Sequence, residues 1–216
     1  NMPVDVQKDE EKGLYYVQKE KKRLYFRKST PAKKIQKYYR ALSMEQDRRS
    51  PHHYFNSVKE VTGKVFVDVG CAEGYSSLEI IEEAKHVYLF EQDEQWLEAI
   101  RATFEPWQDK VTIVQKYVSD HNSSREQTLD DFFNNQTNEH LFLKMDIEGA
   151  ERHALAGCNN LFQNCQKLDF AICTYHLRDD EEVISAFLDK HNCTYINQKG
   201  FFRHKIRSVV MRGSKK

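Results

Sequence analysis

The sequence has no long run of apolar residues. Its apolar runs are short, such as those at residues 65–67 and 87–90, and fall far short of the ~20 residues that a membrane-spanning helix requires. It also lacks the basic, then apolar, then small-residue start of a signal peptide. With 31% charged residues and 39% hydrophobic ones, the composition excludes a membrane protein and a wholly disordered chain. We therefore expect a soluble, cytoplasmic, globular protein with no membrane span.

Cysteine is scarce and forms no recognisable pattern. The number of cysteines is odd, and none of them forms a C-x-x-C pair, which argues against a disulfide framework and a thiolate zinc site. Reduced thiols, as in the cytosol, are the simplest interpretation. The five are Cys71, Cys158, Cys165, Cys173 and Cys193.

A net charge is also absent, but the charges are unevenly distributed. Residues 1–50 carry a net charge of +7, residues 199–216 another +7, and residues 51–198 carry −14. Basic ends on an acidic centre can steer an anionic partner. The alternative, which we favour, is that the ends and the centre attract one another within the fold.

From residue 62 onward, strand and helix patterns alternate with short links. This alternation predicts right-handed crossovers and an α/β fold with a doubly wound, mostly parallel sheet of seven strands. The last two strands have only a turn between them, so they must form an antiparallel hairpin. The expected strands are 65–69, 86–90, 111–114, 141–145, 168–173, 194–196 and 206–211, and the expected helices are 76–84, 94–104, 129–133, 150–161 and 180–191.

The first 55 residues read differently. Residues 14–17 and 24–26 have strand character, so residues 1–30 form either a frayed arm or a short hairpin. A helix follows, with Thr30 as its cap and Pro31 in its first position. We therefore divide the chain into a basic extension, residues 1–55, and a cofactor-binding domain, residues 56–216.

The first strand of the alternating part ends in a glycine-containing turn. Asp68, Gly70 and Gly74 form a D-x-G-x-x-x-G pattern that leads into a helix, and Glu91 ends the next strand. Ligands of open parallel sheets bind beyond the carboxyl ends of the strands, where an acidic residue can accept both hydroxyls of a ribose. A glycine turn that binds no ligand is the alternative.

The charges around this turn indicate which nucleoside would bind. A dinucleotide site would show G-x-G-x-x-G and rest a pyrophosphate on the helix N-terminus, but Ala72 replaces the second glycine. Asp68 and Glu73 make the loop acidic, which is unfavourable for a pyrophosphate. A ribose ligand with a cationic centre, such as S-adenosylmethionine, fits better, with Asp68 near its amino group.

Residues 141–151 form the most distinctive segment. The predicted strand carries Asp146 to the ligand edge, Gly149 permits a sharp exit, and Glu151 opens a helix. Three carboxylates within six residues repel one another unless a positive group lies nearby. A solvated acidic turn is the other interpretation.

These segments together resemble the FkbM family of S-adenosylmethionine-dependent methyltransferases. The resemblance rests on residues 67–74, on 90–91 and on the K-x-D-x-E-G-x-E run at 144–151, and it covers about residues 62–212. It implies a class I methyltransferase (Rossmann-like) fold and O-methylation of a sugar, glycan or other small-molecule hydroxyl. Many members carry an acidic residue two positions before a histidine after the fifth strand, whereas this chain has Thr174 before His176.

Methyl transfer to a hydroxyl needs alignment and a group that removes the acceptor proton. We expect Asp146 near the transferred methyl, His176 as the preferred base because imidazole titrates near neutral pH, and Glu148 beside them. The same three side chains are hard ligands, but nothing fixes their spacing, so we do not favour a divalent metal. The expected cofactor-binding residues are Asp68, Gly70, Cys71, Gly74, Glu91, Gln92, Ser119, Asp120 and Asp146.

Two other functions stay open at this stage. The Lys/Arg and Tyr/Phe residues between 15 and 40 are compatible with a nucleic-acid methyltransferase, although no proline-aromatic tetrapeptide follows the fourth strand. A non-catalytic module that keeps only the fold is the third option. His52, His53 and Tyr54 either cover the acceptor pocket or form a polar loop, and the sequence leaves a homodimer open.

Overall fold

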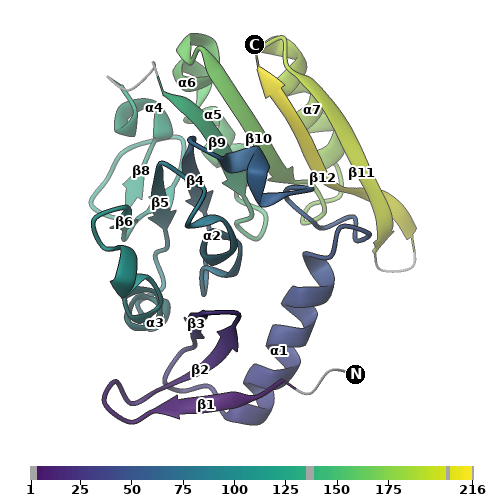
Figure 1. Cartoon of the computed structure of the whole chain (residues 1–216). Coiled ribbons are helices and arrows are strands. Elements are labelled where there is room, and N and C mark those ends of the chain that lie inside the picture. Colours follow the sequence, from purple (N-terminus) through teal and green to yellow (C-terminus); the bar gives the residue numbers. More distant parts are fainter. Residues whose placement is uncertain (1–3, 135–138, 203–204, 216) are drawn as a thin grey trace.

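Seven strands form one sheet at the centre of the molecule, in the order β11-β12-β10-β9-β4-β5-β6 (Figure 1). The computed structural model describes residues 4–134, 139–202 and 205–215. All pairs from β10 to β6 are parallel, whereas β12 is antiparallel to both β10 and β11. The predicted parallel sheet with a final hairpin is confirmed. The strands are β4 (Val65–Val69), β5 (His86–Phe90), β6 (Val111–Val114), β9 (His140–Met145), β10 (Lys167–Cys173), β11 (Thr194–Phe202) and β12 (Lys205–Lys215).

Helices cover both faces of the sheet, because its strands alternate between two apolar cores. In β4, Phe66 packs into one core and Val65, Val67 and Val69 into the other, as a period of two requires. None of the helices in the described ranges has the length and apolar character needed to cross a membrane. The helices of the domain are α2 (Tyr75–Ile80), α3 (Glu94–Phe104), α4 (Leu129–Phe132), α5 (Glu151–Ala156), α6 (Asn159–Asn164) and α7 (Asp180–Lys190), with short 3-10 turns at Val58–Val61 and Glu105–Trp107.

The single helix predicted over 150–161 is wrong, because two short helices occupy this part of the chain. Gly157 ends α5, and a Cβ there would lie 2.1 Å from the backbone oxygen of Ser119. Asp130 accepts hydrogen bonds from the backbone N–H groups of Asn160 and Leu161 in the first turn of α6. The break therefore comes from tertiary contacts that helical periodicity does not record.

The extension is an ordered unit, neither a frayed arm nor a simple hairpin. It forms a three-stranded antiparallel sheet of β1 (Val6–Asp9), β2 (Leu14–Lys19) and β3 (Lys22–Tyr25), followed by α1 (Ala32–Glu45). The predicted start of α1 is off by one residue. Pro31 occupies the N-cap in an extended conformation, and no side chain caps the helix, so Thr30 does not have the expected role.

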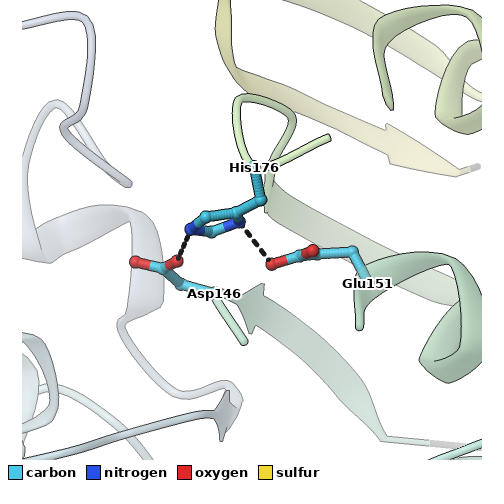
Figure 2. Close-up of side chains that lie close together, drawn as sticks. All are labelled: Asp146, Glu151 and His176. Atoms are coloured by element: carbon cyan, nitrogen blue, oxygen red, sulfur yellow. Dashed lines mark ion pairs between the residues drawn. The ribbon is translucent and has the colours of Figure 1, made fainter. Parts of the chain in front are cut away.

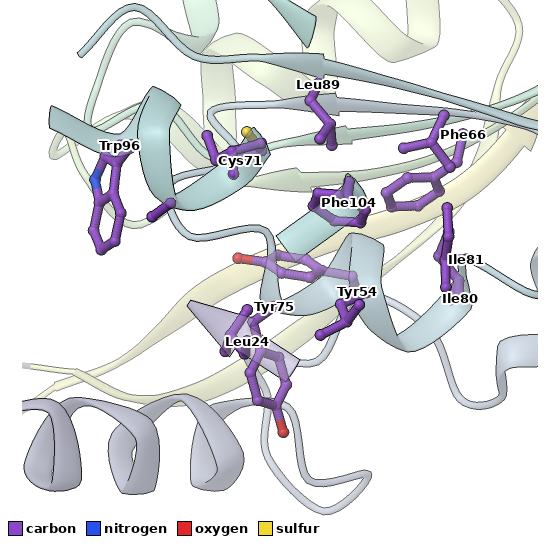
Figure 3. Close-up of a cluster of buried hydrophobic side chains, with 14 of the residues drawn as sticks. Leu24, Tyr54, Phe66, Cys71, Tyr75, Ile80, Ile81, Leu89, Trp96 and Phe104 are labelled. Carbon is purple, nitrogen blue, oxygen red and sulfur yellow. The ribbon is translucent and has the colours of Figure 1, made fainter. Parts of the chain in front are cut away.

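The extension shares a hydrophobic core with the sheet (Figure 3). Leu24, Phe26 and Ile35 are buried in the same cluster as Phe66 and Leu78. Its basic side chains also pair with acidic ones of the domain, at 2.8 Å for Lys12–Glu105, 2.9 Å for Arg27–Asp93 and 3.6 Å for Lys19–Glu79. Attraction between the basic end and the acidic centre thus operates within the fold.

Ile35 is the fully buried anchor of α1, so truncating it tests how firmly the helix is held. We expect Ile35→Ala to lower the free energy of unfolding by about 2–5 kcal/mol, because it leaves a cavity in the shared core. Met44→Ala on the same helix is the control: its side chain is 73% exposed and the change should cost less than ~0.5 kcal/mol. Urea unfolding measures both, and equal effects would show that α1 is not anchored through this core.

Candidate functional site

The site lies where the order of the sheet reverses. From β4 the chain continues outward to β5 and β6, and it then returns to place β9 and β10 on the other side of β4. Loops that leave such a point diverge and open a crevice at the carboxyl ends of the strands. A cavity of about 870 Å³ fills this crevice, and α1 of the extension forms its opposite wall.

A buried ion pair forms the floor of the cavity. Asp68 of β4 and Lys144 of β9 are register partners, with Oδ1 and Nζ 2.8 Å apart and side chains only 1% and 5% exposed. Lys144 Nζ also donates to the carbonyl oxygen of Gly70 at 2.7 Å. Burial lowers the pKa of Lys144, but the charges of Asp68 and Asp146 outweigh it and leave the pKa raised, so the ammonium stays charged.

Asp68 has a second partner within the protein. Its Oδ2 accepts a hydrogen bond of 2.6 Å from the hydroxyl of Ser77 in α2. Lys144 and Ser77 thus contact both carboxylate oxygens of Asp68, beneath the turn of residues 70–74, here called the glycine loop. A direct contact of Asp68 with an amino group stays a prediction, and the observed role is to hold β4, β9 and α2 together.

The glycine loop has the tight turn that the sequence indicates. Gly70 has φ +78°, and a Cβ there would lie 2.1 Å from the backbone oxygen of Asp146, so only glycine fits. Gly74 also has positive φ, but the group that approaches it is the ring of Phe104, which would lie 2.6 Å from a Cβ at this position. Gly70 and Cys71 line the cavity, whereas Gly74, predicted to bind the cofactor, is not among the lining residues.

Glu91 stands at the end of β5 and faces the same cavity, with Gln92 beside it. Its two carboxylate oxygens accept backbone hydrogen bonds from Ala72 at 3.0 Å and from Asp93 at 2.8 Å. Each oxygen retains a further lone pair, so the oriented carboxylate can still accept hydroxyl donors.

The side of α1 that faces the cavity carries four residues at helical spacing, Lys34, Tyr38, Leu42 and Glu45, here called the α1 stripe. Tyr38 connects the stripe to the glycine loop, because its hydroxyl donates to Glu73 Oε2 at 2.7 Å and its ring stacks on Trp96. Helical spacing in the sequence predicts this helix, but it carries no sign that the helix closes a pocket.

Asp146 marks the other end of the cavity, just beyond β9. The Tyr54 hydroxyl donates to its Oδ2 at 2.6 Å and Tyr54 lines the cavity, whereas His52 and His53, grouped with it in the sequence analysis, do not. His52 lies edge-on to Tyr175, with ring centroids 5.4 Å apart, and Tyr175 lines the same end. Glu148 also borders the cavity, but its side chain is 91% exposed.

His176 lies behind Asp146 and is not part of the cavity wall. Its ring stands between two carboxylates, with Nδ1 2.9 Å from Glu151 and Nε2 3.5 Å from Asp146 (Figure 2). Burial lowers the pKa of His176, but the close Glu151 carboxylate and the charges of Asp146 and Glu148 outweigh burial and raise it.

Within the described ranges, one group of side chains has its donor atoms close enough to hold a metal ion: Asp146, Glu151 and His176, within 4.8 Å of one another. Glu151 thus takes the place of Glu148 in the set considered from the sequence. The imidazole occupies the space between the two carboxylates (Figure 2), so the present geometry is that of ion pairs.

Ser119 and Asp120, expected to contact the cofactor, are not among the residues that line the cavity. After β6, Lys116, Tyr117 and Val118 line it instead. These residues lead into a short parallel ladder of β7 (Tyr117–Val118) with β8 (Glu126–Gln127). Asp120 lies beyond this ladder and pairs with the exposed imidazoles of His121 and His153.

Comparison with known families gives a match over most of the chain. The family model described as the methyltransferase FkbM domain matches residues 36–196, from within α1 to within β11. No functionally curated protein matches the sequence.

Solved structures share the fold at low sequence identity. A methyltransferase FkbM from Methylobacillus flagellatus KT has a TM-score of 0.55 and 20% identity, covering 70% of this chain and 43% of that one. The tRNA m1G37 methyltransferase of M. jannaschii has a TM-score of 0.52 and 11% identity, covering 93% of this chain and 56% of that one. This chain therefore spans about half the length of either structure.

The floor of the cavity can be tested through its buried charge. We expect Lys144→Met to lower the free energy of unfolding by about 3–5 kcal/mol, because Asp68 is left buried without its cation. Lys85→Met, which breaks an exposed pair with Glu139, is the control and should cost at most ~1 kcal/mol. If urea unfolding gave the two variants the same stability, the pair would not hold the floor.

Proposed function

Because the chain belongs to the FkbM family of methyltransferase domains, we propose that it uses S-adenosylmethionine to methylate a hydroxyl group of a sugar, glycan or other small molecule. The observation that carries the proposal is one cavity at the point where the strand order reverses, lined by the glycine loop, Glu91 and Asp146. The glycine loop permits close approach of a ligand, and Glu91 can accept hydrogen bonds from ribose hydroxyls. Asp146 supplies a carboxylate for the sulfonium of the proposed cofactor. Methyl transfer needs all three within one enclosed space.

The proposed cofactor would lie along the length of the crevice. Glu91 and Gln92 would hold the ribose, and Gly70, Cys71 and Ala72 would offer a close-packed loop. When bound, S-adenosylmethionine supplies an electrophilic methyl group on a sulfonium. The carboxylates of Asp146 and Glu148, at the end of the cavity opposite Glu91, favour the positive sulfonium. They also provide groups that can orient the acceptor or remove its proton.

The chain's own residues would align the acceptor and exclude water. Tyr54 and Tyr175 line the cavity together with Asp146, and Glu45 lines it from α1. A positioned base typically contributes about 10²–10⁴-fold to such a reaction. Of the side chains predicted for catalysis, Asp146 and Glu148 line the cavity, and Asp146 is the more buried of the two.

The nucleic-acid alternative loses much of its support. Lys12, Lys19 and Arg27, which made the extension appear to be a binding arm, pair with acidic residues of the domain. Several of its aromatic residues, among them Tyr16, Tyr25 and Phe26, are buried in the shared core, so they offer no surface for stacking bases or for a dimer. The extension serves instead as the wall of the pocket.

The two ends of the cavity differ in charge. At one end Arg27 lies over the Trp96 ring and pairs with Asp93, whereas at the other Glu45 lies toward Asp146. Burial raises the pKa of Glu45, and the Asp146 charge raises it further, so the two carboxylates interact across the acceptor end. We infer that a neutral or amine-bearing acceptor is favoured over a phosphorylated one.

An acceptor panel tests this inference about charge. We expect transfer of a labelled methyl group to glucose and glucosamine to exceed transfer to glucose 6-phosphate at least tenfold, because like charges repel in a partly buried site. Glu45→Gln should narrow the difference, whereas Glu98→Gln, on the exposed side of α3, should leave it unchanged. Preference for the phosphorylated sugar would contradict the proposed acceptor class.

The cofactor proposal is tested by calorimetric titration with S-adenosylmethionine and S-adenosylhomocysteine. We expect micromolar binding, weakened about tenfold or more by Glu91→Ala, because hydrogen bonds to a charged group contribute about 1.5–3 kcal/mol. Glu98→Ala serves as the control and should bind like the parent protein. Absence of binding to the parent would leave a methyltransferase fold without transfer activity, which is the non-catalytic alternative.

A further inference from the structure

Glu151 is a completely buried carboxylate that lies outside the cavity. It opens α5, its side chain is 0% exposed, and its Oε1 accepts a hydrogen bond of 2.9 Å from the backbone N–H of Ile147. The same oxygen lies 2.9 Å from Nδ1 of His176. A buried carboxylate needs a compensating positive or donor group, and the imidazole is the group in contact with it.

Residues from several elements surround the ring of His176. Asp146 after β9, Glu148 in the following loop and Glu151 of α5 supply three negative charges around it. The ring of Tyr175, just after β10, has its centroid 4.1 Å from that of His176. This surrounding favours an imidazolium with both ring nitrogens protonated.

We propose that Glu151 and His176 are positioning residues, in which Glu151 holds a protonated His176 ring against Oδ1 of Asp146, so that Asp146 is the group presented to the acceptor. Oδ1 of Asp146 is buried, and an imidazolium whose Nε2 lies 3.5 Å away supports its negative charge from behind as an ion pair, since neither ring nitrogen makes a hydrogen bond of regular geometry. Tyr54 fixes the other oxygen at 2.6 Å. The carboxylate is thereby held from two sides.

This inference replaces His176 as the preferred base, and it rests on the proposed function. A doubly protonated ring has no lone pair to accept a proton, and His176 does not reach the cavity wall. The acceptor hydroxyl would instead give its proton to Asp146 as its oxygen bonds to the methyl carbon. The electron pair of the broken carbon–sulfur bond goes to sulfur, which becomes the neutral thioether of S-adenosylhomocysteine.

The protonation state of His176 can be measured without cofactor or acceptor, so the result is independent of the proposed activity. In ¹⁵N NMR of the histidine rings, with the His176 signals assigned through His176→Asn, we expect both nitrogens to stay protonated to a pH above the ordinary 6.5. Glu151→Gln keeps an oxygen for the Ile147 N–H and should lower this pKa by about one pH unit or more, since a close charge is lost.

The matched control is Glu148→Gln, because Glu148 is also near His176 but is 91% exposed, and its effect should be less than half as large. Asp146→Asn should lower the pKa as well, and it provides the same measurement if Glu151→Gln does not fold. A His176 ring that is neutral at pH 7, or whose pKa is unchanged in both Glu151→Gln and Asp146→Asn, would overturn the proposal and restore His176 as a candidate base.

Discussion

The buried ion pair between Asp68 and Lys144 is the interaction on which the site depends. It joins β4 to β9 across the point where the sheet order reverses, and these are the two strands whose loops diverge to open the crevice. Lys144 also fixes the Gly70 carbonyl, and Asp68 fixes Ser77 at the start of α2. The shape of the glycine loop, and hence the floor of the pocket, follows from one almost fully buried charge pair.

A second constraint comes from the extension. Its apolar residues complete the core on one face of the sheet, so α1 is held in place and cannot act as a free arm. Once α1 is held there, one side of it must face the crevice, and the α1 stripe with Tyr38 on Glu73 closes the cavity. The uneven charge of the chain thus has a structural explanation, since basic end and acidic centre lie against each other.

The sheet could be predicted from sequence because its signals are local. The strands at 65–69, 86–90 and 111–114 are short apolar runs between turns, and the structure has them at the same residues. The cavity-lining roles of Gly70 and Glu91 followed from their places at strand ends. The pocket wall could not be predicted in this way, because Tyr54 meets Asp146, and Tyr38 of α1 meets Glu73, only through tertiary packing between segments far apart in the chain.

The same reason explains the residues that were placed differently. Ser119 and Asp120 follow the third strand in sequence, but the β7–β8 ladder carries them past the cavity. His176 does reach Asp146 with Nε2, as a strand-end position suggests, but its Nδ1 pairs with the buried Glu151. Whether a titratable residue faces a pocket or supports it from behind depends on the packing of its neighbours, which spacing alone does not report.

A crystal structure of the protein with S-adenosylhomocysteine tests the central claim most directly, because that claim assigns one end of a single cavity to the nucleoside and the other to the acceptor. The account predicts ribose hydroxyls on Glu91 and the sulfur atom toward Asp146, with the α1 stripe in contact with the ligand. A ligand bound outside the crevice, or one with its sulfur directed away from Asp146, would contradict it.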